Sequence, residues 1–386
     1  MRKLSLLLGS LLVVASASAK EVVPAPIVVE EAPVQVIEKE VIVYRDRAEG
    51  FRPNGVLNLE TRFYGKAEEL NYRNNEVKNN YTELNLSGDI QMTENQSFAF
   101  EVKSFSDWNH GSDNPKQKGE DGNEIKLDYF YNHGTIGDSK VEFVSRIEYE
   151  NVSADETQRI EYWAGFNLAE YMFNNDYIKT TDFTIGPKYE YEWADSNDDE
   201  YANKIGINLE SMTELPLNFA FELNIFAQQN FLGKKYGFDS GRKEKDKDFT
   251  VDVEAYLYNV TNLYTNSSEN FMLDFVFEGG YDQYNWSQYK LYGHENEDSQ
   301  KSAYSLYAYP GIQGTYQVTP AFSLYAIAGA EYRNWAIESE KSASHWRWQP
   351  TVTVGMTKNI LKNNKRLISK PKNNFSFLFN LLSLLY

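Results

Sequence analysis

The sequence predicts an all-β protein, a transmembrane antiparallel up-and-down β-barrel of about 14 strands, with 16 also possible. Three observations predict this fold. Apolar and polar residues alternate over many segments of roughly ten residues, the connections between them alternate between short and long, and aromatic residues are common in a chain that is otherwise polar. Such segments are typical of strands that face lipid on one side and a polar lumen on the other.

The alternation recurs through residues 55–356. In the segment 55–64, for example, Leu57 and Leu59 share one face, whereas Glu60 lies on the other. None of the apolar faces of these segments carries a charged residue. A soluble β-sandwich also alternates, but its strands are shorter, commonly about 5–6 residues. The segments therefore favour strands that span a membrane.

The predicted connections differ in length between the two ends of the strands. Short connections are expected at 93–96, 213–216 and 319–320, and long polar ones at 107–122, 230–246 and 286–301. Short periplasmic turns at one end and long extracellular loops at the other are the pattern of outer-membrane barrels. With the N-terminus in the periplasm, the first strand runs outward and each long connection falls outside the cell.

Aromatic residues make up 15% of the chain, with 28 Tyr, 23 Phe and 7 Trp, although the mean hydropathy is −0.58. Tryptophan prefers the membrane interface, where its ring is half-buried and its N–H meets polar groups. All seven tryptophans are expected near the outer ends of strands, as one girdle. They are Trp108, Trp163, Trp193, Trp286, Trp335, Trp346 and Trp348.

The N-terminal residues 1–19 are predicted to be a secretory signal peptide, because Arg2 and Lys3 precede an apolar run that ends in an Ala-Ser-Ala cleavage site. That run is too short to span a bilayer. Residues 20–54 are rich in Val, Pro and Glu and are expected to form an extended periplasmic segment, with a plug or a periplasmic contact site as the alternative. The barrel itself is expected at 55–356.

The C-terminal residues 357–386 form an atypical basic and apolar tail, with six basic residues and no acidic one. Three interpretations stay open. The tail could supply a last strand that ends in an aromatic residue, it could be a non-native extension, or it could be a helix that lies on the membrane surface.

The charge balance is strongly acidic, with 38 Lys and Arg against 56 Asp and Glu. Outside the signal peptide and the tail, the imbalance is 30 basic against 56 acidic residues. Such a body would repel nucleic acid, and charges of this sign inside a pore would favour cations. The chain has no cysteine, which excludes disulfides, thiolate metal sites and cysteine nucleophiles.

The polar faces of the predicted strands supply the candidate pore-lining residues. The basic candidates are Arg62, Lys103, Lys126, Arg146, Arg159, Arg333 and Arg347. The acidic candidates are Glu190, Glu192, Glu210, Glu222, Asp252, Glu254, Asp274 and Glu278. One hypothesis is that the bases face the acids across the lumen and create a transverse field. The alternative is that each base pairs with a carboxylate on the next strand, as Arg146 could with Glu161.

No arrangement of residues predicts catalysis. The histidines are scattered over positions 110, 133, 294 and 345, and neither a zinc-protease motif nor a nucleophile elbow nor a phosphate-binding loop occurs. The lysines that alternate with the acids of 241–248 indicate a solvated loop rather than a calcium site. We therefore expect no enzymatic activity, no metal site and no cofactor.

Several local motifs resemble the fusobacterial major outer-membrane porins of the FomA type. They are AKEVVPAP after the signal peptide, EVIVYRDR at Glu40–Arg47, RPNG at Arg52–Gly55, ETRFYGKAE at Glu60–Glu68 and HWRWQP at His345–Pro350. The resemblance extends more loosely over the chain to about residue 356. It implies a general diffusion porin for small hydrophilic solutes that is trimeric and weakly selective. The tail departs from the family, which ends with its closing strand and a terminal aromatic residue.

The sequence as a whole thus predicts a porin of the bacterial outer membrane. Its expected partners are outer-membrane lipid, small hydrophilic solutes, the barrel-assembly machinery and further copies of itself in a homo-oligomer, a trimer by the resemblance. Small residues that point outward near the C-terminal end of the barrel, Ala326 and Ala328 among them, would allow close approach of another copy. One alternative is a surface adhesin that uses its long loops. Another is a plugged transporter for hydrophobic compounds, which would need an apolar lumen, and the carboxylate-rich lumen face counts against it.

Overall fold

The computed structural model describes residues 51–68, 81–106, 122–153, 156–194, 200–238, 243–288, 305–337 and 342–360. The chain divides into two units, residues 1–50 and residues 51–386, and all described residues belong to the second. The predicted signal peptide, most of the segment 20–54 and most of the tail lie outside the described residues.

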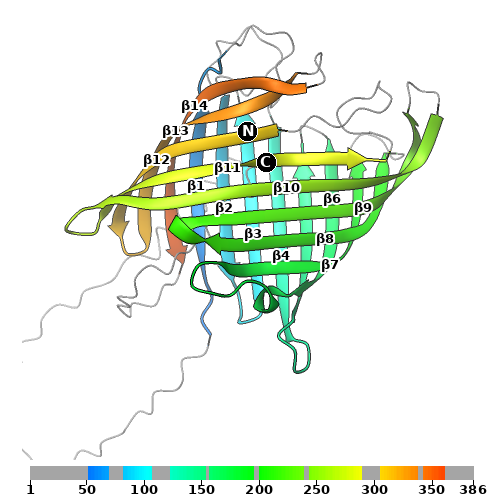
Figure 1. Ribbon diagram of the computed structural model, residues 1–386, viewed down its shortest axis with the longest axis horizontal. Helices are drawn as coiled ribbons and strands as arrows, with labels where there is room; N and C mark the ends of the chain where they lie inside the picture. Colours follow the sequence, from blue (N-terminus) through cyan, green and yellow to red (C-terminus); the bar gives the residue numbers. More distant parts are fainter. Residues whose placement is uncertain are drawn as a thin grey trace, which may run out of the picture. The chain divides into compact units, whose positions relative to one another are not determined.

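Fourteen antiparallel strands form one closed barrel (Figure 1). They are β1 (Asn54–Tyr64), β2 (Tyr81–Gln91), β3 (Gln96–Ser106), β4 (Gly122–Thr135), β5 (Glu142–Val152), β6 (Thr157–Asn167), β7 (Lys179–Ala194), β8 (Tyr201–Leu215), β9 (Phe219–Phe238), β10 (Lys243–Thr265), β11 (Phe271–Ser287), β12 (Ser305–Thr319), β13 (Phe322–Ile337) and β14 (Ser342–Ile360). Each strand pairs with its neighbours in sequence, so the predicted up-and-down barrel of 14 strands is confirmed.

The barrel closes where β1 pairs with β14, from Gly55 opposite Ile360 to Tyr64 opposite Thr351. Closure leaves no strand edge, so every strand can satisfy its backbone donors and acceptors without water. Strand β14 continues to Ile360, so its last residues lie beyond the predicted end of the barrel at residue 356. In Figure 1, β7–β12 cross in front of β1–β6 at a steep angle, as tilted strands of a closed barrel do.

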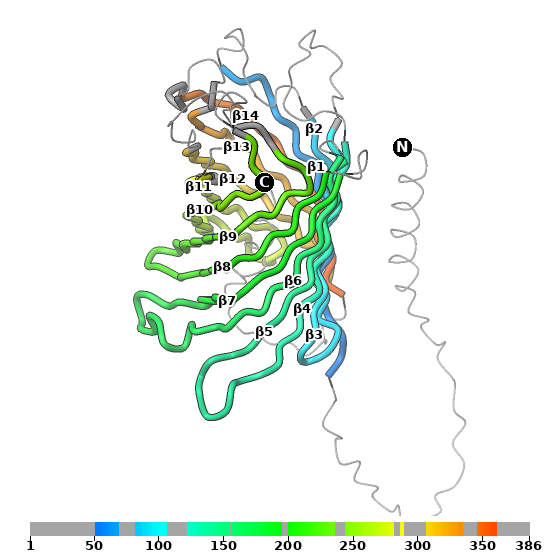
Figure 2. Tube along the Cα trace, turned by 90° about the vertical axis from the view of Figure 1, so that its right-hand side faces the viewer, coloured from blue at the N-terminus to red at the C-terminus, as the bar shows by residue number. Residues whose placement is uncertain are grey.

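The two ends of the barrel differ in their connections. The three longest intervals between strands, 65–80, 107–121 and 288–304, follow β1, β3 and β11, which all run in the same direction across the barrel. Figure 2 shows the turns of the opposite end following one another around the wall. On the rule for outer-membrane barrels, the end with the longest connections is the extracellular one.

One predicted loop is wrong. Residues 230–246 were expected to form a long connection, but β9 extends to Phe238 and β10 begins at Lys243, so most of the region is a paired hairpin. Conversely, the connection at 168–178 on the short-turn side is longer than expected and contains the 3-10 helix η1 (Ala169–Tyr171). A second 3-10 helix, η2 (Pro216–Asn218), joins β8 to β9. Within the described ranges, no helix is long and apolar enough to cross a membrane.

Candidate functional site: the inner face of the barrel

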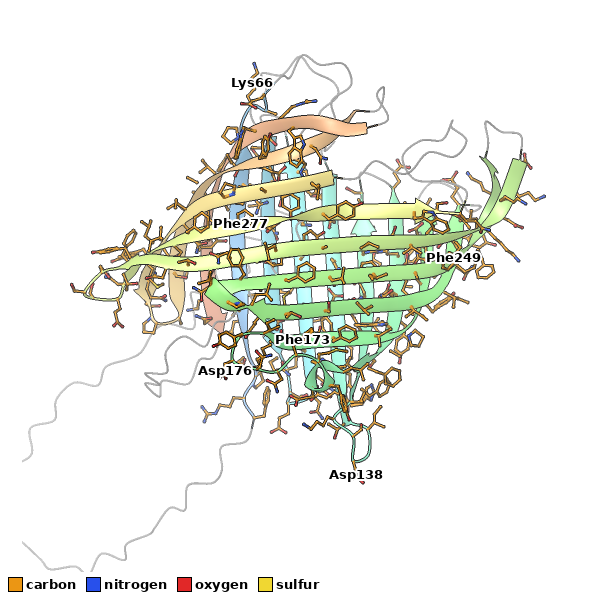
Figure 3. The ribbon with its side chains drawn as sticks, in the orientation of Figure 1. Lys66, Asp138, Phe173, Asp176, Phe249 and Phe277 are labelled. Carbon is orange, nitrogen blue, oxygen red and sulfur yellow. The ribbon has the colours of Figure 1, made fainter. Side chains whose placement is uncertain are left out.

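The outer face of the barrel is apolar and exposed. Ile205 and Ile207 on β8 are 56% and 53% exposed, and Val352 and Val354 on β14 are also exposed. Figure 3 shows the side chains on the outside of the wall, with Phe277 labelled in the middle of β11 and Phe249 near the outer end of β10. Exposed apolar side chains on every second residue would be unstable in water, whereas they match a hydrocarbon environment.

Aromatic residues gather toward the outer end of this face. The rings of Phe249 and Trp286 lie 6.3 Å apart, and Tyr332 stacks 4.9 Å from Trp346 and packs 4.7 Å from Trp348. All three tryptophans are more than two-fifths exposed. Half-exposed rings at one level of a barrel are the mark of the membrane interface.

Trp163 does not belong to this girdle, so that part of the prediction is wrong. It lies two residues after Glu161 on β6, and the parity of the strand therefore turns both side chains inward. Its ring is buried, its Nε1 donates a hydrogen bond to the carbonyl of Gly186 at 3.1 Å, and the guanidinium of Arg146 lies 4.9 Å from its centroid. Trp108 and the side chain of Trp335 lie outside the described residues.

The inner face reverses the usual distribution of charge in a protein. Lys103 is 2% exposed and Glu190 is 1% exposed, although both are ionisable, while the apolar residues beside them in sequence point outward. A closed barrel with an apolar exterior and a charged interior is suited only to a bilayer. Hydrocarbon covers the apolar side chains, and barrel closure pairs the backbone donors and acceptors that lipid cannot. The chain is a bacterial outer-membrane β-barrel. Its predicted location is thereby confirmed on the chain's own geometry.

Comparison with solved structures finds other outer-membrane barrels at low similarity. The outer-membrane channel DcaP of Acinetobacter baumannii is 9% identical, with a TM-score of 0.34 over 80% of this chain and 96% of that one. Omp33 of Acinetobacter baumannii is 7% identical, with a TM-score of 0.31 over 81% and 100%. OprD from Pseudomonas aeruginosa is 10% identical, with a TM-score of 0.29 over 81% and 96%. At these scores the likeness says nothing about solutes or selectivity. The sequence matches no protein-family model and no curated protein.

On strands β3–β8 the predicted basic residues are all in ion pairs. Lys103 Nζ lies 3.2 Å from a carboxylate oxygen of both Glu101 and Glu124. Lys126 Nζ lies 3.2 Å from Glu148, which also binds Arg159 at 3.1 Å. Each of these bases therefore meets carboxylates on its own strand or on the next one.

Arg146 is the centre of this network. Its guanidinium lies 2.9 Å from Glu161 on β6, 3.1 Å from Glu210 on β8 and 3.7 Å from Glu148 on its own strand. The pair with Glu161 is the one that the pairing alternative predicted. The contact with Glu210 joins strands that are three apart in the barrel, so it fastens a wide section of wall.

The network continues through two lysines that the predicted lining omitted. Lys188 on β7 lies 3.0 Å from both Glu161 and Glu190, and Lys204 on β8 lies 2.8 Å from Glu190 and 2.7 Å from Glu192. Parity alone could have found both lysines, because each shares the inner face with the predicted acids. Strands β7 and β8 are therefore not purely acidic, and on β3–β8 the geometry favours local pairing over separated charge.

The acids on β9–β11 have a different environment. Glu222 accepts hydrogen bonds from the Tyr258 hydroxyl at 2.9 Å and from Asn224 at 2.7 Å. Glu278 accepts one from the Tyr307 hydroxyl. These inward tyrosines, which the sequence interpretation did not single out, pack together as a buried cluster. In this part of the wall, tyrosine hydroxyl groups are the hydrogen-bond donors to the carboxylates, whereas lysine and arginine side chains have that role on β3–β8.

Two further acids of this region, Asp252 and Asp274, form no ion pair among the described residues. Asp274 accepts a hydrogen bond from Asn262 at 2.8 Å. Asp252 is 9% exposed, and its Oδ1 has no hydrogen-bond donor in the part of the chain that the structure describes. Glu254 lies on β10 at a half-buried position of the same face. The inner face of β9–β11 thus carries an excess of negative charge.

The three predicted arginines of β1, β13 and β14 do not lie at one level. Arg333 and Arg347 are directly opposite each other and buried, and Arg333 forms an ion pair with Glu331 at 2.7 Å. Arg62 instead lies opposite Thr353 on β14. Its guanidinium forms an ion pair with Glu60 on the same strand, at 3.9 Å. Two of the three therefore form a group at the outer end, and the third lies deeper in the barrel.

No metal site is evident among the described residues, where no group of three or more His, Asp or Glu side chains converges. The predicted absence of catalysis stays a prediction. Within the described ranges, the chemistry of the inner face is that of fixed charges and hydrogen-bonding groups, which can select and orient solutes.

Proposed function

We propose that this protein is a porin that lets small hydrophilic solutes and ions diffuse across the outer membrane. The observation that carries the proposal is the inner face, where charged and hydrogen-bonding side chains from every strand meet inside a closed barrel. Such a lining can replace part of the hydration of a polar solute, and it would repel an apolar one. The fifteen predicted residues would line this path, with Lys188 and Lys204 added to them.

We further propose a mild preference for cations. The bases on β3–β8 are balanced by carboxylates, whereas Glu222, Asp252, Asp274 and Glu278 form no ion pair among the described residues. An excess of fixed negative charge enriches cations in the lumen, and the effect is largest at low salt.

Planar-bilayer recording tests both statements. Purified protein should produce stepwise conductance increases, and the reversal potential in a KCl gradient should have the sign of a cation-preferring pore. Anion selectivity would overturn the charge argument alone. A membrane that contains folded protein but stays electrically silent would overturn the porin proposal and would favour the alternative of a surface adhesin.

The resemblance to the FomA-type porins also leads us to propose a homotrimer. Ala326 and Ala328 on β13 are exposed on the outer face, and Gly314 on β12 lies opposite Ala326 in the register. Small side chains let two barrels approach closely. We expect Ala328→Trp to shift the protein toward monomer on a non-denaturing gel, while Ile205→Trp, on the outer face of the distant strand β8, should alter it less. An unchanged oligomer in Ala328→Trp would contradict an interface at this position.

A further inference from the structure

A small cavity opens in the inner wall of the barrel at the extracellular end of β5, β6 and β7. It measures about 170 Å³ and is lined by Glu150, Val152, Thr157, Gln158, Arg159 and Glu192. This volume is several times the ~30 Å³ that one water molecule occupies in the liquid. It is also smaller than the roughly 300 Å³ at which pockets for drug-sized ligands begin. The cavity therefore has the size of a small solute.

A cation and an anion face this cavity without touching each other. Arg159 on β6 lies directly opposite Glu192 on β7, yet none of the ion pairs among the described residues joins these two side chains. Arg159 pairs with Glu148 at 3.1 Å and with Glu150, both on β5. Glu192 pairs with Lys204 on β8 at 2.7 Å. Each charge is thus held by the strand on its far side, and both line the cavity.

Both side chains stay accessible from the lumen. Each is 35% exposed, whereas Glu148 and Glu161 in the adjoining network are 5% and 6% exposed. Among the described residues, Nη1 of Arg159, Oε1 of Glu192 and the hydroxyl of Thr157 have no hydrogen-bond partner. A solute in the cavity can therefore meet a cationic donor, a hydroxyl group and a carboxylate at once.

We propose that this cavity binds the zwitterionic group of a small α-amino acid at the entrance of the pore. The carboxylate of the solute accepts hydrogen bonds from Arg159 and Thr157, and its ammonium group donates to Glu192 and Glu150. Directly opposite residues on adjacent strands have Cβ atoms about 4.5–5.5 Å apart, so their charged groups suit two solute charges on one carbon. The role as an entry site rests on the porin proposal, whereas the binding itself does not need conduction.

Saturation-transfer NMR of the full-length protein in deuterated detergent tests this site, with L-alanine as the probe. We expect alanine to bind with a dissociation constant on the order of 1 mM. Ethylammonium and propionate, which each carry only one of the two charges, should bind at least severalfold more weakly. A six-carbon ω-amino acid, whose charges are far apart, should also bind more weakly. Thr157→Val with Glu192→Gln should weaken alanine binding on the order of tenfold, because each exposed polar contact contributes a few-fold.

The matched control is Glu142→Gln, which removes the same charge from the exposed periplasmic end of β5. It should bind alanine as the wild type does. Equal binding of ethylammonium or propionate, unchanged binding in the double variant, or equal weakening in the control would each overturn the site. A protein that conducts in a planar bilayer but gives no alanine signal would overturn the site and leave the porin proposal standing. Alanine binding by a protein that does not conduct would support the site and overturn the porin proposal.

Discussion

Replacing Arg146 with Ala should destabilise the barrel by about 3–5 kcal/mol. Arg146 contacts Glu148, Glu161 and Glu210, and its own side chain is largely buried. Removing the cation takes from Glu210 its arginine partner in a poorly solvated wall. Glu148 and Glu161 keep Lys126, Arg159 and Lys188, but the carboxylates around the vacated position then repel one another more strongly. The ring of Trp163 also loses the guanidinium that lies over it.

Urea unfolding of the micelle-bound protein, followed by tryptophan fluorescence, measures this change. Arg146→Lys should fall between wild type and Arg146→Ala, because lysine keeps the charge but cannot reach several carboxylates with a planar fork. Lys140→Ala is the control, since Lys140 pairs with Glu170 at 3.8 Å in an exposed position and should matter little. If Arg146→Ala and Lys140→Ala unfolded at the same urea concentration, the network would not stabilise the wall.

Much of the fold follows from parity in the sequence. Apolar residues on every second position define the outer face, and the same rule places Lys103 or Glu190 inside without any knowledge of their partners. Closure follows as well, because an amphipathic sheet in a bilayer cannot leave an edge unpaired. The same rule places Trp163 on the inner face, because it is two residues from Glu161. The prediction that Trp163 belongs to the aromatic girdle relied instead on the preference of tryptophan for interfaces, and it is wrong.

The hairpin of β9 and β10 shows where hydrophobic alternation fails as a signal. Residues 243–248 alternate in the sign of their charge but not in polarity, so hydrophobic alternation predicts a solvated loop there. Above the membrane both faces of a strand can be polar, and the backbone hydrogen bonds between β9 and β10 are then enough to continue the ladder. A strict period of two in charge sign was the available clue.

The ion-pair partners could be predicted only between adjacent strands. The pair of Arg146 with Glu161 follows from neighbouring positions on β5 and β6. The pair of Arg146 with Glu210 joins strands three apart, and it depends on strand tilt and on the length of the arginine side chain. Neither the strand tilt nor the reach of the side chain can be obtained from alternation. The sequence therefore predicts a clearer separation of basic and acidic residues across the lumen than the structure has on β3–β8.

Neutralising the acids of the tyrosine-rich wall should reduce the cation preference of the pore. The triple variant Glu222→Gln, Asp252→Asn and Glu278→Gln removes three carboxylates that have no ion pair among the described residues. Each amide keeps nearly the shape of the carboxylate and can still accept a hydrogen bond from a tyrosine hydroxyl. The lumen should therefore keep its dimensions while losing much of its excess negative charge.

Reversal potentials in a dilute KCl gradient at mildly alkaline pH, where carboxyl groups are ionised, measure the effect. We expect the cation-to-anion permeability ratio to fall by about twofold or more, because fewer fixed charges enrich the counter-ion. The control variant Glu94→Gln, Asp138→Asn and Glu269→Gln removes the same charge from exposed turns at the periplasmic end. It should change the ratio much less, since those turns lie in bulk solvent where salt screens them. If both variants changed the ratio equally, selectivity would depend on the overall charge of the protein rather than on the wall of β9–β11.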